Sequence, residues 1–210
     1  MSILSQLSSQ VGDRTEYSNR KVVLQVLDEP TLLEDIVAGL DDKDAALVGD
    51  CAEVLTQVAE TRPDWVAPHA KKLGGLLDHR KTRVRWEAMH ALALVAPLAP
   101  KVIGPLLPRL GELIRNDASV IVRDYAVDAI ANYAKTSRKA AQASYPYLKQ
   151  ALTVWDGKQA GHALNGLTIV AAVAPKLASE LNAIGRQHLE HRRGVVRQAA
   201  KKLVQTTENM

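Results

Sequence analysis

The sequence predicts an all-α fold: a right-handed α-α superhelix of about five helical pairs, closed by a terminal capping helix. Three observations predict it. Segments recur at offsets of 37 and 38 residues, the apolar residues in each segment are spaced as on one face of a helix, and the chain has no Phe and only 4% aromatic residues. A helix pair with one apolar face per helix must stack on a neighbour to bury it, and small aliphatic side chains suit close stacking.

The repeat is clearest between residues 54–68 and 91–105, which align at an offset of 37 residues. A further offset of 38 residues aligns Val84-Arg85 with Val122-Arg123. A period maintained over several units is typical of a solenoid. The positions that match across the first two segments are Leu55, Val58, Ala59, Pro63, Val66 and Pro68, which correspond to Leu92, Val95, Ala96, Pro100, Ile103 and Pro105.

Each unit contains two amphipathic stripes, which predict two helices. In the first helix, apolar residues fall at i, i+4, i+7, i+8 and i+11, the pattern of a helix that is buried on one face. Successive first stripes begin at Leu47, Val84, Val122, Gln159 and Val196. Successive second stripes begin at Leu33, Val66, Ile103, Ala141 and Ala178.

These stripes predict one solenoid domain at 18–207, preceded by a frayed Ser- and Gln-containing segment at 1–17. The chain ends break the pattern, as expected because a terminal repeat must present a polar outer face to water. The predicted units span 18–43, 44–80, 81–117, 118–156 and 157–192, and the cap spans 193–207.

The composition excludes several classes of protein. Cys51 is the only cysteine, so neither a disulfide framework nor a multi-cysteine zinc site is expected. The longest apolar stretches are about half of what a membrane-spanning helix needs. The amino terminus has no basic start followed by a long apolar stretch, so no secretory signal is expected. We therefore expect a cytoplasmic protein.

The repeat pattern resembles that of the HEAT-repeat family, over about residues 20–205. Asp78 precedes Val84-Arg85 and Asp117 precedes Val122-Arg123, as an Asp precedes Val-Arg in that family, and Val196-Arg197 recurs in the cap. The unit at 157–191 departs from the pattern, with Gln159-Ala160 in place of Val-Arg, and Leu47-Val48 departs likewise.

The resemblance implies a concave surface that is built by the second helices and holds partners, and it implies no particular chemistry. It also implies a structural role for the conserved-pattern Asp and Arg residues, which usually tie one repeat to the next in that family. In this chain those residues are Asp78, Arg85, Asp117, Arg123 and Arg197.

Charge is distributed unevenly along the chain. Residues 1–69 carry a net charge of −8, and residues 70–210 carry a net charge of +12. A solvated surface accounts for this in part, but a basic region also favours an anionic partner, either an acidic protein segment or a phosphate backbone. The cations expected to face the groove, because they lie off the apolar stripes of the second helices, are Lys71, Lys72, Arg109, Lys149 and Arg186.

Three aromatic residues are candidate contacts, because exposed aromatic side chains beside cations are typical of interface hot spots. Trp86 corresponds to polar or small residues in other units, and Trp155 lies between helices. Tyr147 aligns with Lys72 and Arg109 on the second helices. We predict Tyr147 as a groove contact and Trp86 and Trp155 as peripheral anchors.

The search for catalytic motifs is negative. The sequence has no Gly-rich phosphate loop, no nucleophile elbow and no His-Glu-x-x-His motif, so we predict no catalytic residues and no cofactor. His188 and His191 flank Glu190, but the adjacent Arg192-Arg193 opposes a cation and no third ligand has suitable spacing. We therefore predict no metal site.

The leading hypothesis is a non-catalytic scaffold that holds a protein partner with an acidic or mixed surface in a basic concave groove. A nucleic-acid-binding protein is the alternative, since HEAT-like alkylpurine DNA glycosylases also use a basic groove with a Trp and an Asp near the lesion. Trp155-Asp156 is similar, but Gln159 stands where the acid of that family is expected. Self-association is a third possibility, and the sequence leaves the oligomeric state open.

Overall fold

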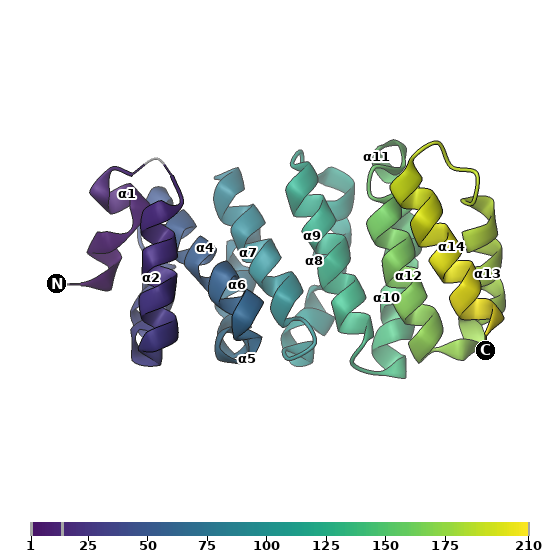
Figure 1. Cartoon of the computed structure of the whole chain (residues 1–210), viewed down its shortest axis with the longest axis horizontal. Helices are drawn as coiled ribbons and strands as arrows, with labels where there is room; N and C mark the ends of the chain where they lie inside the picture. The colour runs from purple at the N-terminus through teal and green to yellow at the C-terminus, as the bar shows by residue number, and fades with distance from the viewer. Residues whose placement is uncertain (1, 14, 210) are drawn as a thin grey trace. The chain divides into compact units, whose positions relative to one another are not determined.

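A computed structural model describes residues 2–13 and 15–209. Contacts within the chain group it into two compact units, unit 1 (Met1–Ala99) and unit 2 (Pro100–Met210). Regular structure in the described residues is helical throughout, which confirms the predicted all-α class (Figure 1). None of these helices is both long and apolar enough to span a membrane.

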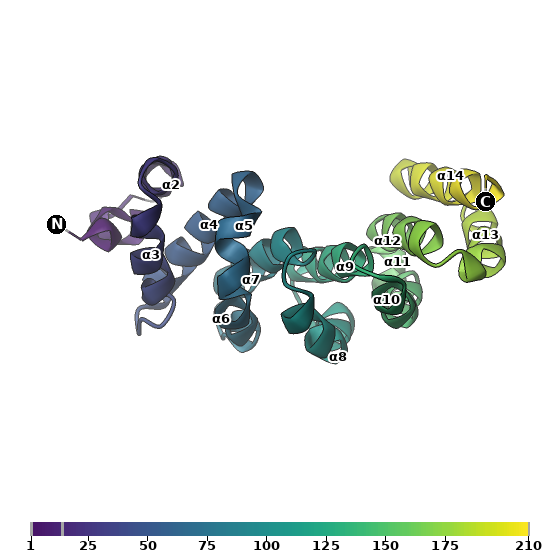
Figure 2. The same cartoon turned by 90° about the horizontal axis from the view of Figure 1, so that it is seen from below.

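In unit 1, the long helices α2, α4 and α7 pack in sequence, α2 against α4 and α4 against α7. Shorter helical segments pack beside them, α3 against α4 and α6 against α7 (Figure 2). The elements are η1 (Ile3–Gln6), α1 (Ser8–Val11), α2 (Tyr17–Asp28), η2 (Pro30–Leu32), α3 (Leu33–Gly39), α4 (Ala45–Thr61), α5 (Pro63–Val66), η3 (Ala67–His69), α6 (Ala70–Gly75), η4 (Leu76–Asp78) and α7 (Thr82–Val95).

Residues 3–9 pack against the rest of unit 1, within the segment 1–17 that the sequence predicts to be frayed. Ile3 and Leu7 are buried. The backbone N–H of Ser8 donates to the side chain of Asn19 (2.9 Å), and that of Ser9 donates to the Asp50 carboxylate (2.7 Å). Two apolar anchors and two backbone hydrogen bonds, one buried and one partly buried, offset the entropy of ordering this segment.

In unit 2, α9, α12 and α14 form one layer, and α8, α10 and α13 pack on it (Figure 2). Ser119 and Ser137 begin α9 and α10 by accepting a backbone N–H, the usual role of an N-cap serine. The elements are α8 (Pro100–Asn116), α9 (Val120–Ala134), α10 (Arg138–Ala151), α11 (Val154–Gly157), α12 (Ala160–Val173), η5 (Pro175–Leu177), α13 (Ala178–Gln187) and α14 (Gly194–Glu208).

The core consists of small aliphatic residues, as the composition predicts. Val122, Ala126 and Ile130 of α9 are fully buried along one stripe. Gly166 of α12 lies so close to α10 that a Cβ atom would come within 2.8 Å of Leu148. A larger residue would separate the two helices, which explains why a glycine occupies this contact.

Three arginines that occupy equivalent repeat positions make equivalent contacts. Arg85, Arg123 and Arg197 each donate from Nη1 to the carbonyl six residues earlier, at 2.9, 2.5 and 2.8 Å. Each of these carbonyls lies just after the helix that ends the preceding pair, so the contact joins consecutive helix pairs. The Asp117 carboxylate accepts the Ser119 N–H (2.8 Å), and Asp78 is exposed at the end of η4.

Candidate functional site

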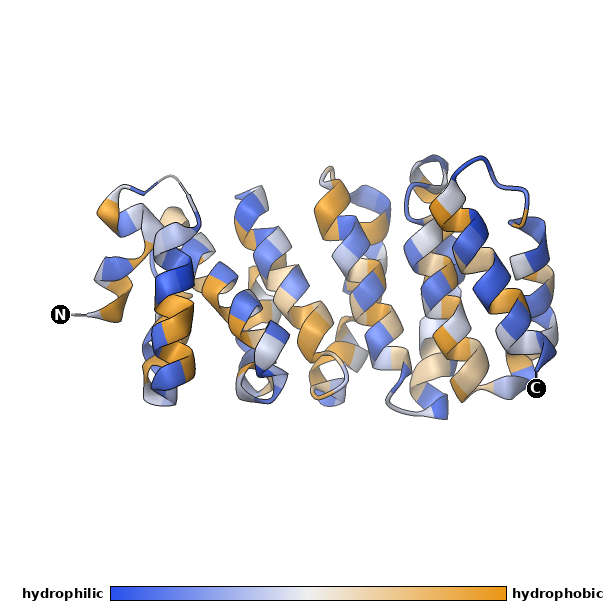
Figure 3. Cartoon of the chain, viewed as in Figure 1, coloured by the Kyte–Doolittle hydropathy of each residue, from blue (hydrophilic) through white to orange (hydrophobic). Residues whose placement is uncertain are grey.

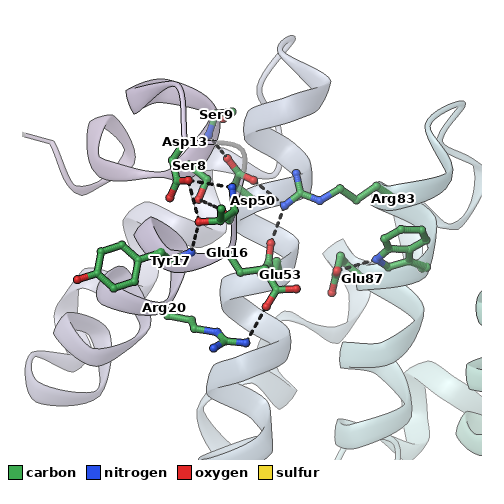
Figure 4. A pocket seen from close by; sticks show the side chains of 12 residues that line it. Ser8, Ser9, Asp13, Glu16, Tyr17, Arg20, Asp50, Glu53, Arg83 and Glu87 are labelled. Carbon is green, nitrogen blue, oxygen red and sulfur yellow. Dashed lines mark hydrogen bonds and ion pairs between the residues drawn. The ribbon is translucent and has the colours of Figure 1, made fainter.

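A pocket of about 800 Å³ opens in unit 1 beside α2, α4 and α7 (Figure 4). Its lining is unusual in charge, because five carboxylates face two guanidinium groups. We call it the acidic pocket. Its charged lining residues are Asp13, Glu16, Asp50, Glu53, Glu87, Arg20 and Arg83, and its aromatic ones are Tyr17 and Trp86.

The floor of the acidic pocket is a buried network on α4. Asp50 and Glu53 are 0% and 5% exposed. Arg83 of α7 donates to both carboxylates, to Asp50 Oδ1 at 2.7 Å and to Glu53 Oε2 at 2.5 Å (Figure 4). Asn19 of α2 donates to the same two groups, at 3.1 and 2.9 Å. One guanidinium and one amide therefore fix α4 to both neighbouring helices.

This network keeps Asp50 ionised despite its burial. Burial by itself raises the pKa of Asp50, but hydrogen bonds from Ser9, Asn19 and Arg83 outweigh it and hold the pKa below its usual value. The charge is thus built into the fold. Asp50 and Glu53 therefore have a structural role, because their carboxylates are already hydrogen-bonded within the fold.

Glu87 differs from these two carboxylates because it makes no ion pair within the described residues. Its Oε1 accepts the indole N–H of Trp86 at 2.6 Å, and its backbone carbonyl accepts the hydroxyl of Thr56 at 3.0 Å. Burial raises the pKa of Glu87 to about 7, and the nearby Glu53 carboxylate adds to this effect. Glu87 is therefore the pocket carboxylate with capacity for an added cation.

The rim of the acidic pocket is exposed. Glu16 pairs with Arg20 at 2.9 Å, and both side chains are mostly in solvent. Tyr17 is exposed, with Lys21 over its ring at 4.3 Å. A second hollow, of about 360 Å³, shares Glu16, Arg20, Glu53 and Glu87 with the pocket and extends it to Gln57, Glu60 and His90. We call the two hollows together the acidic furrow.

The furrow has the chemistry of a cation receptor. In its partly desolvated wall a carboxylate attracts a guanidinium or an ammonium group more strongly than in bulk water. A flat cation can also lie against an indole. Within residues 2–13 and 15–209, no group of three or more His, Cys, Asp or Glu is arranged to hold a metal ion. Burial raises the pKa of the Cys51 thiol to about 12, so it is a poor nucleophile.

The cations predicted to line a groove lie on the second helices, and most of them have a partner. Lys72 donates to the carbonyl of Val37 (3.0 Å) and pairs with Asp41 (2.6 Å). Lys71 is exposed. In unit 2, the pairs are Arg109 with Glu112 (2.8 Å), Lys149 with Glu180 (2.7 Å) and Arg186 with Glu208 (2.5 Å).

The three predicted aromatic contacts have different environments. Trp86 lines the acidic pocket. Tyr147 is half-buried, and its ring fills the space in which a side chain at Gly111 of α8 would lie. Trp155 is 40% exposed, its indole N–H donates to the carbonyl of Ile114 (3.1 Å), and its ring lies 4.0 Å from the Arg123 guanidinium. Trp86 belongs to unit 1 and Trp155 to unit 2.

The sequence reasoning missed Asp50, Glu53 and Glu87. A signal for the first two was present. Asp50 and Glu53 interrupt an otherwise apolar stretch of α4 from Leu47 to Leu55, and buried carboxylates require partners. Their partners Asn19 and Arg83 are about 30 residues away in either direction, so the network could not be identified from spacing along one helix.

Comparisons with known proteins agree with this fold. No family model matches the sequence, and no curated protein matches it significantly. Among solved structures, an engineered protein has a TM-score of 0.75 at 19% identity, covering 99% of this chain and 95% of that chain. A designed armadillo repeat protein has a TM-score of 0.75 at 20% identity, covering 98% of each chain.

A further designed armadillo repeat protein, in complex with the peptide (KR)4, has a TM-score of 0.73 at 20% identity and covers 98% of each chain. At these identities the likeness shows the fold alone. The chain therefore has an all-helical repeat fold, as the sequence predicts, and the likeness is to armadillo-type designs rather than specifically to HEAT repeats.

Proposed function

We propose that this protein is a non-catalytic cytoplasmic scaffold that binds a segment of a protein partner, and that the acidic furrow receives a Lys or Arg side chain of that segment. The observation that carries this is Glu87, a half-buried carboxylate with no ion pair among the described residues, in a pocket of about 800 Å³. A partner cation would supply the counter-charge that the fold does not.

The comparisons support this choice of partner. One neighbour of the same fold is described in complex with the peptide (KR)4, and another as designed for modular peptide recognition. The furrow has the charge that such a peptide requires. Its two hollows share four lining residues, and a segment that occupied both would place cations beside Glu87 and Glu60.

The basic groove predicted from the sequence stays a secondary proposal. Arg109, Lys149 and Arg186 each have an acidic neighbour, and an anionic partner would have to displace it. Exposed pairs of this kind are weak, so displacement is feasible. Nucleic acid remains the alternative occupant of that groove, and strong weakening of binding by salt would identify it.

We also propose that the repeats are of HEAT type. This is supported by the two helices in each unit and by the three arginines that make the same contact between consecutive pairs. No functional conclusion depends on the choice between HEAT and armadillo repeats.

The furrow is tested by calorimetric titration with an eight-residue peptide in which Lys and Arg alternate. The double variant Glu60→Gln, Glu87→Gln removes two furrow charges without touching the buried network. We expect it to weaken binding about tenfold or more, because two charge-assisted contacts are lost. The matched control, Asp28→Asn with Asp35→Asn, removes the same charge from exposed sites of unit 1 outside the furrow.

Equal weakening by the furrow variant and by the control would contradict the proposal, since only net charge would then matter. Preference for an all-Glu peptide, or for labelled duplex DNA at about 50 mM salt, would instead favour the basic groove.

A further inference from the structure

Unit 2 has a hollow of its own, lined by residues of α11 and by residues at or near the starts of α9, α12 and α14. These helix starts and α11 lie along one edge of the unit (Figure 1). The volume of the hollow is about 380 Å³. The cationic lining residues are Lys158, Arg192 and Arg193, and the acidic ones are Asp124 and Asp156. We call it the edge hollow. Its lining residues differ from those of the acidic furrow in their charge and in the groups that they contact.

The edge hollow has a net positive lining, with three cations against two carboxylates. Lys158 and Arg192 are exposed and make no ion pair in the described part of the chain. Arg193 uses its guanidinium to hold the carbonyls of Gly157 (3.2 Å) and Lys158 (2.8 Å), which does not neutralise it. By contrast, the second-helix cations Lys149 and Arg186 are each paired with a carboxylate.

His162 also lines the edge hollow, and its charge when protonated is balanced by Asp128. Its Nδ1 lies 2.8 Å from Asp128, and that hydrogen bond raises the pKa of the imidazole. Asp124 accepts the side-chain amide of Gln159 at 3.1 Å, which occupies one of its oxygens. Residues 100–210 as a whole contain 16 Lys and Arg and 8 Asp and Glu, a net charge of +8.

Val120 lines the edge hollow, and further exposed apolar side chains lie at the starts of α9 and α14. Val120 and Ile121 at the start of α9 and Val195 at the start of α14 are 43%, 42% and 58% exposed. Figure 3 shows hydrophobic residues at these two helix ends. In α9 and in α14, the apolar residues at the start of the helix are exposed to solvent, and the buried stripe of that helix follows them. Clustered exposed apolar residues beside unpaired charges are typical of a protein interaction site.

The backbone beside the edge hollow is held in an unfavourable conformation. Trp155 and Asp156 have φ values of 52° and 54°, a region that residues other than glycine rarely adopt. The Trp155 indole is fixed by Arg123 and by the Ile114 carbonyl, and Arg193 holds the Gly157 carbonyl. Such strain persists only where the surroundings enforce it, and it tends to occur at functional sites.

We propose that the edge hollow docks an extended segment of a protein partner in which an acidic side chain is flanked by an apolar one. Lys158 and Arg192 would receive the carboxylate, and Ile121 and Val195 would receive the apolar side chain. Charge complementarity favours this occupant, because three cations against two carboxylates leave the lining with a net charge of +1. The apolar neighbours and the two carboxylates of the lining disfavour a bare phosphate backbone.

The probe is a fluorescein-labelled peptide with three Glu-Leu-Gly-Ser repeats, measured by fluorescence anisotropy. The variant Lys158→Gln, Arg192→Gln should weaken its binding at least about fivefold, since two charge-assisted contacts are removed. The matched control is Lys201→Gln with Lys202→Gln, an equal loss of charge from the exposed face of α14. The control should weaken binding less than twofold.

The apolar half is tested separately. The double variant Ile121→Ser, Val195→Ser should weaken binding of the same peptide about threefold or more, because both side chains lose contact with its Leu residues. Leu24→Ser, which changes an exposed leucine of unit 1, should have no effect. Peptides with Glu-Gly-Gly-Ser or Lys-Leu-Gly-Ser repeats should bind at least about fivefold more weakly than the probe.

Three results would overturn this inference. One is equal weakening by the edge variant and by its control. Another is tighter binding of single-stranded DNA than of the peptide at about 150 mM salt. The third is a mass in light scattering that rises with protein concentration and returns to that of one chain in the edge variant, which would assign the edge hollow to self-association. The acidic furrow is not altered in any of these variants, so its test is independent.

Discussion

The two units of this chain place their charges in opposite ways. In unit 1, which has a net charge of −4, two carboxylates and an arginine form a network in the interior. In unit 2, which has a net charge of +8, ion pairs such as Lys149–Glu180 and Arg186–Glu208 lie on the surface, and the interior is aliphatic apart from Arg123 and a few polar groups. The comparison separates charges that hold the fold from charges that are available to a partner.

Burial determines which of these roles a charged residue takes. A buried carboxylate must have partners within the fold, because leaving it unpaired costs several kcal/mol. An exposed pair exchanges with water at little cost. Glu87 is intermediate, half-buried and without an ion pair among the described residues, and Lys158 and Arg192 are exposed and unpaired. At these residues a partner of opposite charge would add an ion pair that the fold itself does not provide.

The largest expected effect is on the buried network. Asp50→Ala would leave the Ser9 N–H, the Asn19 amide and the Arg83 guanidinium without their shared acceptor. We expect a loss of about 3 kcal/mol in the free energy of unfolding, measured by urea denaturation. In unit 2, Asp128→Asn breaks the more exposed pair with His162 and should cost less than about 1 kcal/mol. Similar losses for the two variants would contradict the distinction between the units.

Trp155 is the aromatic residue of unit 2 whose loss should matter for stability. Trp155→Ala removes the stacking on Arg123 and the hydrogen bond to Ile114, so we expect a loss of about 2 kcal/mol by thermal or urea unfolding. Trp155→Phe keeps a ring over the guanidinium and loses the N–H, so it should recover about half of this loss. No change for the Ala variant would show that the ring does not hold the strained segment.

The titration of Glu87 should make the free energy of unfolding depend on pH. Because its folded pKa, about 7, lies above the ordinary value of 4.5, the folded state binds the proton more tightly than the unfolded state. Its ionisation therefore lowers stability as pH rises from about 4.5 to about 7, by on the order of 2 kcal/mol. Glu87→Gln should match the wild type near pH 4 and exceed its stability near pH 8. Parallel stability curves for the two proteins would contradict the raised pKa.

A smaller gain in stability is expected at Asp156. Its φ of 54° is accessible to glycine without strain, so Asp156→Gly should raise the free energy of unfolding by about 0.5–1 kcal/mol. Asp156→Ala, which keeps the strain and removes the carboxylate, serves as the control. If both variants behave alike, the carboxylate and not the backbone determines the effect.

The smallest effect on stability is expected on the second helices of unit 2. Arg109→Glu with Lys149→Glu reverses two charges in exposed ion pairs. We expect the melting temperature to stay nearly unchanged and the affinity for an anionic partner of the proposed basic groove to fall. Unfolding of this variant would place these residues in the contact between helix pairs.

The sequence was sufficient to predict the helical-repeat fold, because its main signal is periodic. Stripes such as Val122, Ala126, Ala129 and Ile130 repeat within one helix, and each is buried as its spacing predicts. The order of residues 3–11 could not be predicted in this way. It depends on Asn19 and Asp50, which lie outside the segment and accept its backbone N–H groups.

The candidate sites were less predictable for the same reason. The sequence identified Trp86, Trp155 and the basic cations by type and helix position, but their partners come from neighbouring helices. Whether Lys149 is free or paired depends on Glu180, 31 residues later in the chain. The acidic furrow requires three helices to converge, and the strain at Trp155 and Asp156 is a property of the backbone that residue types did not reveal.

The central claim is that the two units recognise segments of opposite charge at independent sites. The most direct test measures the Lys-Arg peptide and the Glu-Leu peptide against both site variants, by anisotropy in one buffer. We predict that the double variant Glu60→Gln, Glu87→Gln weakens binding of the Lys-Arg peptide only. The double variant Lys158→Gln, Arg192→Gln should weaken binding of the Glu-Leu peptide only. The claim would be contradicted if either variant weakened binding of both peptides. It would also be contradicted if neither variant weakened binding of either peptide.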